Sequence, residues 1–145
     1  MAYLVDTNVL LRLAAPADPR HRSAARAVEG RAQEGLVVAS QNLIEFWNVS
    51  TRPVENNGLG QTTRAAEQVL RSLEQTFSRL PEPAETYSRW RDLVVRFGVS
   101  GAKVHDARLV ALMLVNGVER ILTFNAADFR RYEVLGIRAV VPEEA

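Results

Sequence analysis

An aspartate ends the apolar run at the N-terminus of this chain. Asp6 follows residues 1–5, Met-Ala-Tyr-Leu-Val, and precedes Thr7-Asn8 and a second apolar run. A short apolar run that ends in a turn-forming tripeptide predicts a buried parallel strand leading directly into a helix. In open α/β sheets, ligands bind outside the carboxyl ends of the strands. The sequence therefore predicts that Asp6 lies at a ligand-binding edge, beside the free amides of a helix start.

The rest of the chain alternates between strand and helix patterns. Further strands are predicted at 36–39, 77–80, 120–124 and 137–141. Helices are predicted at 7–13, 20–34, 42–49, 62–77, 84–97 and 104–115, with a short one near Asp128. This order predicts an α/β fold, a three-layer α/β/α sandwich with a mainly parallel central sheet. The 145 residues suffice for one buried core, so we expect residues 1–145 to form a single domain.

Composition excludes several kinds of site. The chain has no cysteine and only two histidines, which excludes disulfides, thiolate metal sites and cysteine nucleophiles, so any bound metal must be held mainly by oxygen. The net charge is only +1, although all basic residues except Lys103 are arginine. No run approaches the roughly 20 apolar residues of a membrane span, and a strand pattern begins at the N-terminus. We therefore expect a cytoplasmic protein without a membrane partner.

Four acids share one kind of local setting. Asp6, Glu45, Asp106 and Asp128 each lie close to a predicted strand end or early in a predicted helix. An acid near a helix N-terminus can simply complement the helix dipole, by about 0.3 to 1 kcal/mol, and needs no function. If several of them converge, however, their repulsion favours a divalent ion, and an all-oxygen ligand set suits Mg²⁺ or Mn²⁺. Such a site would hydrolyse a phosphodiester without a covalent protein intermediate.

The order of the motifs resembles that of PIN domains, specifically the small ribonuclease toxins of bacterial toxin-antitoxin pairs called VapC. The resemblance covers essentially the whole chain. It is carried by Val5-Asp6-Thr7-Asn8, Asn42-Leu43-Ile44-Glu45-Phe46, His105-Asp106-Ala107 and Leu122-Thr123-Phe124-Asn125-Ala126-Ala127-Asp128-Phe129. Each motif is weak by itself, and their order and spacing together are specific.

The resemblance implies a Mg²⁺- or Mn²⁺-dependent endoribonuclease that acts on RNA. It implies that Asp6, Glu45 and Asp106 are metal-binding catalytic acids, with Asp128 as the fourth or with Asn125 in its place. Supporting roles fall on Thr7, Asn8, Thr123 and Asn125. It also implies a homodimer and a cognate antitoxin protein. Whether the site holds one ion or two stays open.

Candidate substrate contacts are basic and aromatic. Arg12, Arg20, Arg22 and Arg26 belong to the first two predicted helices, which leave the edge where the acids are expected. Lys103 and His105 flank Asp106 and are further candidates for contact with phosphate. Trp47 and Trp90 recur with aliphatic residues at helical spacing, which is typical of a core or a dimer interface rather than a base-stacking platform.

Other functions compete with this interpretation. A phosphatase or receiver-like domain is disfavoured, because Asp6-Thr7-Asn8 lacks a paired aspartate and the only lysine precedes Asp106 instead of following a late strand. An RNA-processing PIN nuclease outside a toxin system remains an alternative. So does a catalytically weak PIN-fold module that only binds RNA or protein.

Overall fold

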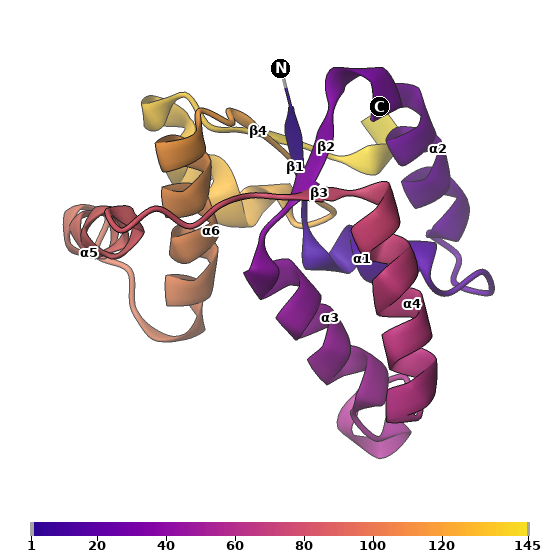
Figure 1. The fold of residues 1–145 in the computed structure, drawn as a ribbon. Coiled ribbons are helices and arrows are strands. Elements are labelled where there is room, and N and C mark those ends of the chain that lie inside the picture. Colours follow the sequence, from indigo (N-terminus) through magenta and orange to yellow (C-terminus); the bar gives the residue numbers. More distant parts are fainter. Residues whose placement is uncertain (1, 145) are drawn as a thin grey trace.

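The computed structural model of the chain describes residues 2–144 and is built around a parallel sheet. The five strands have the order β3-β2-β1-β4-β5, and every pair of neighbours is parallel (Figure 1). They are β1 (Tyr3–Val5), β2 (Leu36–Val38), β3 (Ser78–Arg79), β4 (Arg120–Leu122) and β5 (Arg138–Val140). The mainly parallel sheet expected from the sequence is thus confirmed. All five carboxyl ends meet at one edge.

Helices cover both faces of the sheet, which gives the expected three layers (Figure 1). One face carries α1 (Thr7–Leu13), α2 (His21–Arg31), α3 (Ser40–Thr51) and α4 (Thr63–Thr76). The other carries α5 (Thr86–Arg96), α6 (Val104–Asn116) and the 3-10 segment η4 (Ala126–Leu135). Short 3-10 turns are η1 (Ala32–Glu34), η2 (Val54–Asn56), η3 (Gly101–Lys103) and η5 (Pro142–Glu144). Across residues 2–144 no helix is both long and apolar enough to span a membrane.

The central strand β1 contributes side chains to both hydrophobic clusters, one on each face of the sheet. Leu4 packs into the cluster under α5 and α6, whereas Tyr3 and Val5 pack into the cluster under α1, α2, α3 and α4. Successive side chains of a strand point to opposite faces, and both faces of β1 are covered. All three side chains are therefore buried, and the strand contains no alternating polar residue.

Local signals set most helix boundaries as predicted. The Thr62 hydroxyl accepts a hydrogen bond from the Ala65 amide at 3.1 Å and begins α4. The turn between α3 and α4 needs a glycine, because a Cβ on Gly58 would lie 1.9 Å from the Arg52 carbonyl oxygen. The predicted short helix near Asp128 is a 3-10 segment of ten residues, and Asn125 makes no side-chain cap there.

Candidate active site

Asp6 lies at the end of β1 and caps α1. Its Oδ1 accepts a hydrogen bond from the Thr7 amide at 2.8 Å, and its Oδ2 accepts one from the Thr123 hydroxyl at 2.8 Å. The Asn8 side-chain amide donates to the same Oδ2 at 3.3 Å. Only 7% of Asp6 is exposed, and this burial raises its pKa to about 6 although the hydrogen bonds oppose the shift. The charged carboxylate is thus poorly solvated at neutral pH.

Asn8 and Thr123 join the start of α1 to the end of β4. The Asn8 Nδ2 donates to the Thr123 hydroxyl at 3.2 Å, and the Asn8 Oδ1 accepts from the Phe124 amide at 3.0 Å. The Asn125 amide donates to Thr123 Oγ1 at 3.0 Å. Asn125 thus contributes through its backbone, and its side chain is exposed. These bonds fix the carboxylate of Asp6 in one orientation.

Glu45 approaches from α3 through a chain of polar contacts. The Thr7 hydroxyl donates to Glu45 Oε1 at 2.9 Å and accepts from the Asn42 side-chain amide at 3.1 Å. Asn42 is fully buried, and its Oδ1 also accepts from the Ala39 amide at 2.9 Å. No separate role is predicted for Asn42 from the sequence. The sequence feature that could have indicated this role is an asparagine in the first turn of a helix that directly follows a strand, where its side chain can bond to the backbone.

Asp106 and Asp128 occupy the other side of the same edge. Asp106 lies half-buried in the first turn of α6, and burial raises its pKa, with the negative charge of Asp128 acting in the same direction. Lys103 lowers it, and this lysine donates to Asp128 Oδ1 at 2.6 Å. Asp128 is therefore held by a cation that the chain itself supplies.

The structure brings the four predicted acids within electrostatic reach of one another. Asp106 and Glu45 both raise the pKa of Asp6, and Asp128 and Glu45 both raise that of Asp106. Within residues 2–144, however, no three His, Cys, Asp or Glu side chains converge as a ready group of metal ligands. Two of the acids instead have partners from the chain, Thr7 for Glu45 and Lys103 for Asp128. The four acids are neighbours without being in contact.

The donor set fits a hard divalent cation. It consists of carboxylate oxygens, and the buried carboxylate of Asp6 has a raised pKa for which a cation would compensate. A cation would compete with Thr7 for Glu45 and with Lys103 for Asp128.

The predicted basic residues lie in different surroundings. Arg12 and Arg20 lie over the ring of Phe124, 6.0 and 5.1 Å from its centroid, and the Arg12 Nε is 3.4 Å from Asp18 Oδ2. Since Phe124 follows Thr123, these two arginines adjoin the acidic edge. The other predicted basic residues, Arg22, Arg26, Lys103 and His105, are exposed.

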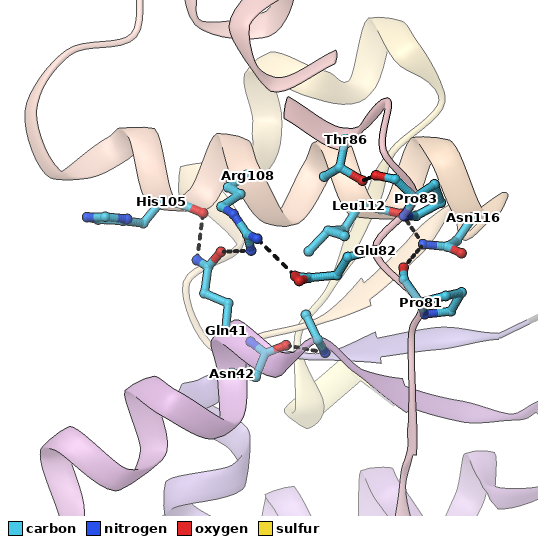
Figure 2. A network of polar contacts seen from close by, with 11 residues as sticks. Gln41, Asn42, Pro81, Glu82, Pro83, Thr86, His105, Arg108, Leu112 and Asn116 are labelled. Atoms are coloured by element: carbon cyan, nitrogen blue, oxygen red, sulfur yellow. Dashed lines mark hydrogen bonds and ion pairs between the residues drawn. The ribbon is translucent and has the colours of Figure 1, made fainter. Parts of the chain in front are cut away.

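A polar network that no sequence motif indicates joins the starts of α3 and α6 (Figure 2). The Gln41 side-chain amide donates to the His105 carbonyl at 2.8 Å. The Arg108 guanidinium donates to Gln41 Oε1 at 3.1 Å and to Glu82 Oε1 at 2.9 Å. Its members are far apart in the chain, so no local motif could indicate it. The network fixes the two helices that carry Glu45 and Asp106 relative to each other.

Comparison with known proteins identifies the fold. The family model described as PIN domain matches residues 3–135. Among solved structures, VapBC2 from Rickettsia felis bound to a promoter DNA fragment matches with a TM-score of 0.70 and 12% identity, over 97% of this chain and 98% of that chain. VapBC-1 from nontypeable Haemophilus influenzae matches with a TM-score of 0.68 and 16% identity, over 98% of each chain.

A third similar structure is Mycobacterium tuberculosis VapC20, described as a sarcin-ricin loop cleaving toxin. Its TM-score is 0.69 at 20% identity, over 94% of this chain and 96% of that chain. A search of curated proteins finds no match to the sequence. At these identities, the likeness to the solved structures concerns the fold.

Proposed function

The chain belongs to the PIN domain family, whose members are nucleases, and from this we propose that it is a metal-dependent endoribonuclease that hydrolyses RNA phosphodiester bonds. The observation that carries the proposal is the buried carboxylate of Asp6, whose pKa is raised to about 6 next to the negative charges of Asp106 and Glu45. Uncompensated charge of this kind is typical of functional sites. We propose that residues 1–145 form one nuclease domain.

PIN nucleases generally use divalent metal ions, and we propose Mg²⁺ or Mn²⁺ for this chain. Asp6, Glu45, Asp106 and Asp128 would hold it. A bound ion of this kind lowers the pKa of a water molecule and stabilises negative charge that develops on a phosphoryl group.

The residues around the acids hold them in place for this reaction. Thr123, Asn8 and the Thr7 amide orient the Asp6 carboxylate, and the Thr7 hydroxyl orients Glu45. Lys103 forms an ion pair with Asp128. A metal ion would compete with Lys103 for the carboxylate, and a substrate phosphate would compete with Asp128 for the lysine.

We propose Asp128 rather than Asn125 as the fourth acid. Asp128 acts electrostatically on Asp106, whereas Asn125 contributes a backbone amide to Thr123. For the substrate, we propose that Arg12, Lys103 and His105 contact RNA phosphates, because they surround the acidic edge.

We further propose that the chain is the toxin of a toxin-antitoxin pair, acts in the cytoplasm and forms a homodimer. Supporting this, two of the similar structures are described as VapBC, and a third is described as a toxin. A small antitoxin would cover an apolar groove on α1, α2 and α4. Apolar side chains on these helices are only partly buried: Leu11, Leu13, Val28, Val69 and Leu70. The antitoxin would also direct a basic side chain toward the acids.

Cleavage of RNA by the purified protein tests the nuclease. We expect EDTA to abolish cleavage and Mg²⁺ or Mn²⁺, but not Ca²⁺ alone, to restore it, because calcium accepts looser coordination. Asp6→Asn and Asp106→Asn should abolish cleavage, Asp128→Asn should weaken it less, and Glu55→Gln, which removes an exposed carboxylate on η2, should leave it unchanged. Undiminished cleavage in excess EDTA, or wild-type cleavage by Asp106→Asn, contradicts the proposal.

Expression in cells tests the toxin role separately. The wild-type chain should arrest growth, Asp6→Asn should not, and co-expression of a small antitoxin encoded by a neighbouring gene should restore growth. If the wild-type chain does not slow growth at levels confirmed by blotting, the toxin role is wrong, and an RNA-processing nuclease is the remaining interpretation. A protein that binds RNA without cleaving it would be a PIN-fold binding module.

A further inference from the structure

A cavity of about 480 Å³ lies beside the acidic site, where the start of α5 faces the start of α6. Its walls include the rings of Tyr87 and Trp90 and the side chains of Thr86, His105 and Arg108. This volume is in the range of pockets that bind small organic groups, about 300 to 1,000 Å³. The mixture of aromatic rings with a few polar groups is also typical of such pockets.

The cavity adjoins a hollow that one of the four acids lines. A second hollow of about 470 Å³ is lined by Glu45, Gln41 and Ile44, and it shares Glu82, His105 and Arg108 with the first. Arg108 lines both hollows, and Figure 2 shows its side chain between Gln41 and Glu82. A chain molecule bound at Glu45 could therefore extend past Arg108 into the cavity.

The aromatic wall is well placed to stack on a flat ring. Tyr87 is 66% exposed, although a large aromatic side chain usually packs into the core. Its ring centroid lies 5.7 Å from that of Trp90, and the Trp90 Nε1 donates to the Val104 carbonyl at 2.8 Å. Trp90 is thus held by α6 and supports Tyr87 from one side. Exposed aromatic rings of this kind stack on the bases of single-stranded nucleic acids.

Two arginines lie beyond Tyr87. A third hollow of about 510 Å³ is lined by the same tyrosine together with Arg91, Arg96 and Asp92. Both arginines are exposed, and arginine binds phosphate in a bidentate manner. Cationic groups that could hold a phosphate thus adjoin the exposed ring of Tyr87 on the side away from Glu45.

We propose that the cavity binds an unpaired nucleobase of the RNA, stacked on Tyr87, next to the phosphodiester at the acidic site. Arg91 and Arg96 then contact the adjoining phosphate. This inference rests on the proposed ribonuclease function and specifies the substrate as single-stranded at this position, because a base within a duplex cannot stack on a protein ring. Trp90, expected from the sequence to lie in a core or dimer interface, packs partly buried against the core under α5 and α6, and from there it supports the base-binding site.

Binding of short RNAs to a cleavage-deficient Asp106→Asn protein tests the inference. Fluorescence anisotropy would measure the affinity for a labelled single-stranded RNA and for versions with one abasic position at a time. In the Asp106→Asn background, Tyr87→Ala should weaken binding about tenfold, the typical size of one base-stacking contact. Tyr87→Phe keeps the ring and Val54→Ala removes an equally exposed apolar side chain on η2, so both should bind normally.

The abasic series identifies the base that occupies the cavity. One abasic position should weaken binding to the parent protein and have no further effect on Tyr87→Ala. If Tyr87→Ala binds with unchanged affinity and an unchanged abasic profile, the inference is wrong and the nuclease proposal stands. A change of oligomeric state by light scattering, without any base-specific loss, would show that a second copy occupies the cavity instead. If the parent protein binds no RNA, both proposals fail.

Discussion

Replacing Asp6 with asparagine should change how the stability of the metal-free protein depends on pH. Burial raises the pKa of Asp6 from 3.8 to about 6, so its charged form is disfavoured in the folded state. At about 1.4 kcal/mol for each pH unit between these two values, the cost of ionisation is roughly 3 kcal/mol. A cost of this size is a large fraction of the stability of a small domain.

The direction of the effect follows from the number of bound protons. Below about pH 4, Asp6 is protonated in both the folded and the unfolded chain. Between about pH 4 and 6, the folded protein retains a proton that the unfolded chain has lost, so the free energy of unfolding falls as pH rises and stays low above that range. Asparagine does not ionise, so Asp6→Asn lacks this pH-dependent contribution. Its stability relative to wild type should therefore increase by roughly 3 kcal/mol between pH 4 and pH 7.

Urea unfolding in EDTA at several pH values measures this difference. Asparagine reproduces only part of the hydrogen bonding of Asp6, which adds an offset that does not vary with pH. The dependence of this stability difference on pH therefore tests whether burial raises the pKa of Asp6, and the constant offset does not. Asp92→Asn, which removes an exposed carboxylate, serves as the matched control. A difference between wild type and Asp6→Asn that is constant from pH 4 to 7 would refute the role of burial.

Three further results are expected. Asn42→Ala leaves the Ala39 amide without its partner, so the free energy of unfolding in urea should fall by roughly 1 to 3 kcal/mol, and an unchanged value would contradict the role of this amide. Lys103→Gln removes the competing cation from Asp128, so calorimetric titration should show tighter Mn²⁺ binding, whereas weaker binding would exclude competition. Mn²⁺ should raise the melting temperature of wild type more than that of Asp6→Asn, because a ligand that binds only the folded state stabilises it; equal shifts would remove Asp6 from the metal site.

The sequence predicted the layers of the fold well because burial on two faces leaves a simple pattern. The run that contains Leu4 has no polar interruption, which predicted a covered parallel strand. The two residues of β3 are exposed, and they form a strand because they pair with Val37 and Val38. The buried apolar residues on either side, Phe77 and Leu80, still indicated a strand in the sequence. The 3-10 character of η4 could not be predicted, because 3-10 and α-helices share similar local signals.

For the candidate site, the sequence predicted which acids are neighbours but not what holds them. The positions of Asp6 and Asp106 follow from strand and helix boundaries. The contact of Lys103 with Asp128 and that of Arg108 with Gln41 join residues 25 and 67 positions apart, and they depend on how α6 packs against the sheet. The role of Asn42 depends on its complete burial, which is a property of the assembled core.

During translation, the first strand leaves the ribosome long before one of its two neighbours exists. β1 pairs with β4, and the partners Tyr3 and Arg120 are 117 positions apart. Thr123, which donates to Asp6, belongs to the same late segment. Chains arrested before Arg120 should therefore lack the protease resistance of the native fold, and resistance in such chains would contradict this order of assembly. In the proposed nuclease, the Asp6 carboxylate therefore gains the hydroxyl that orients it only after Thr123 has been synthesised.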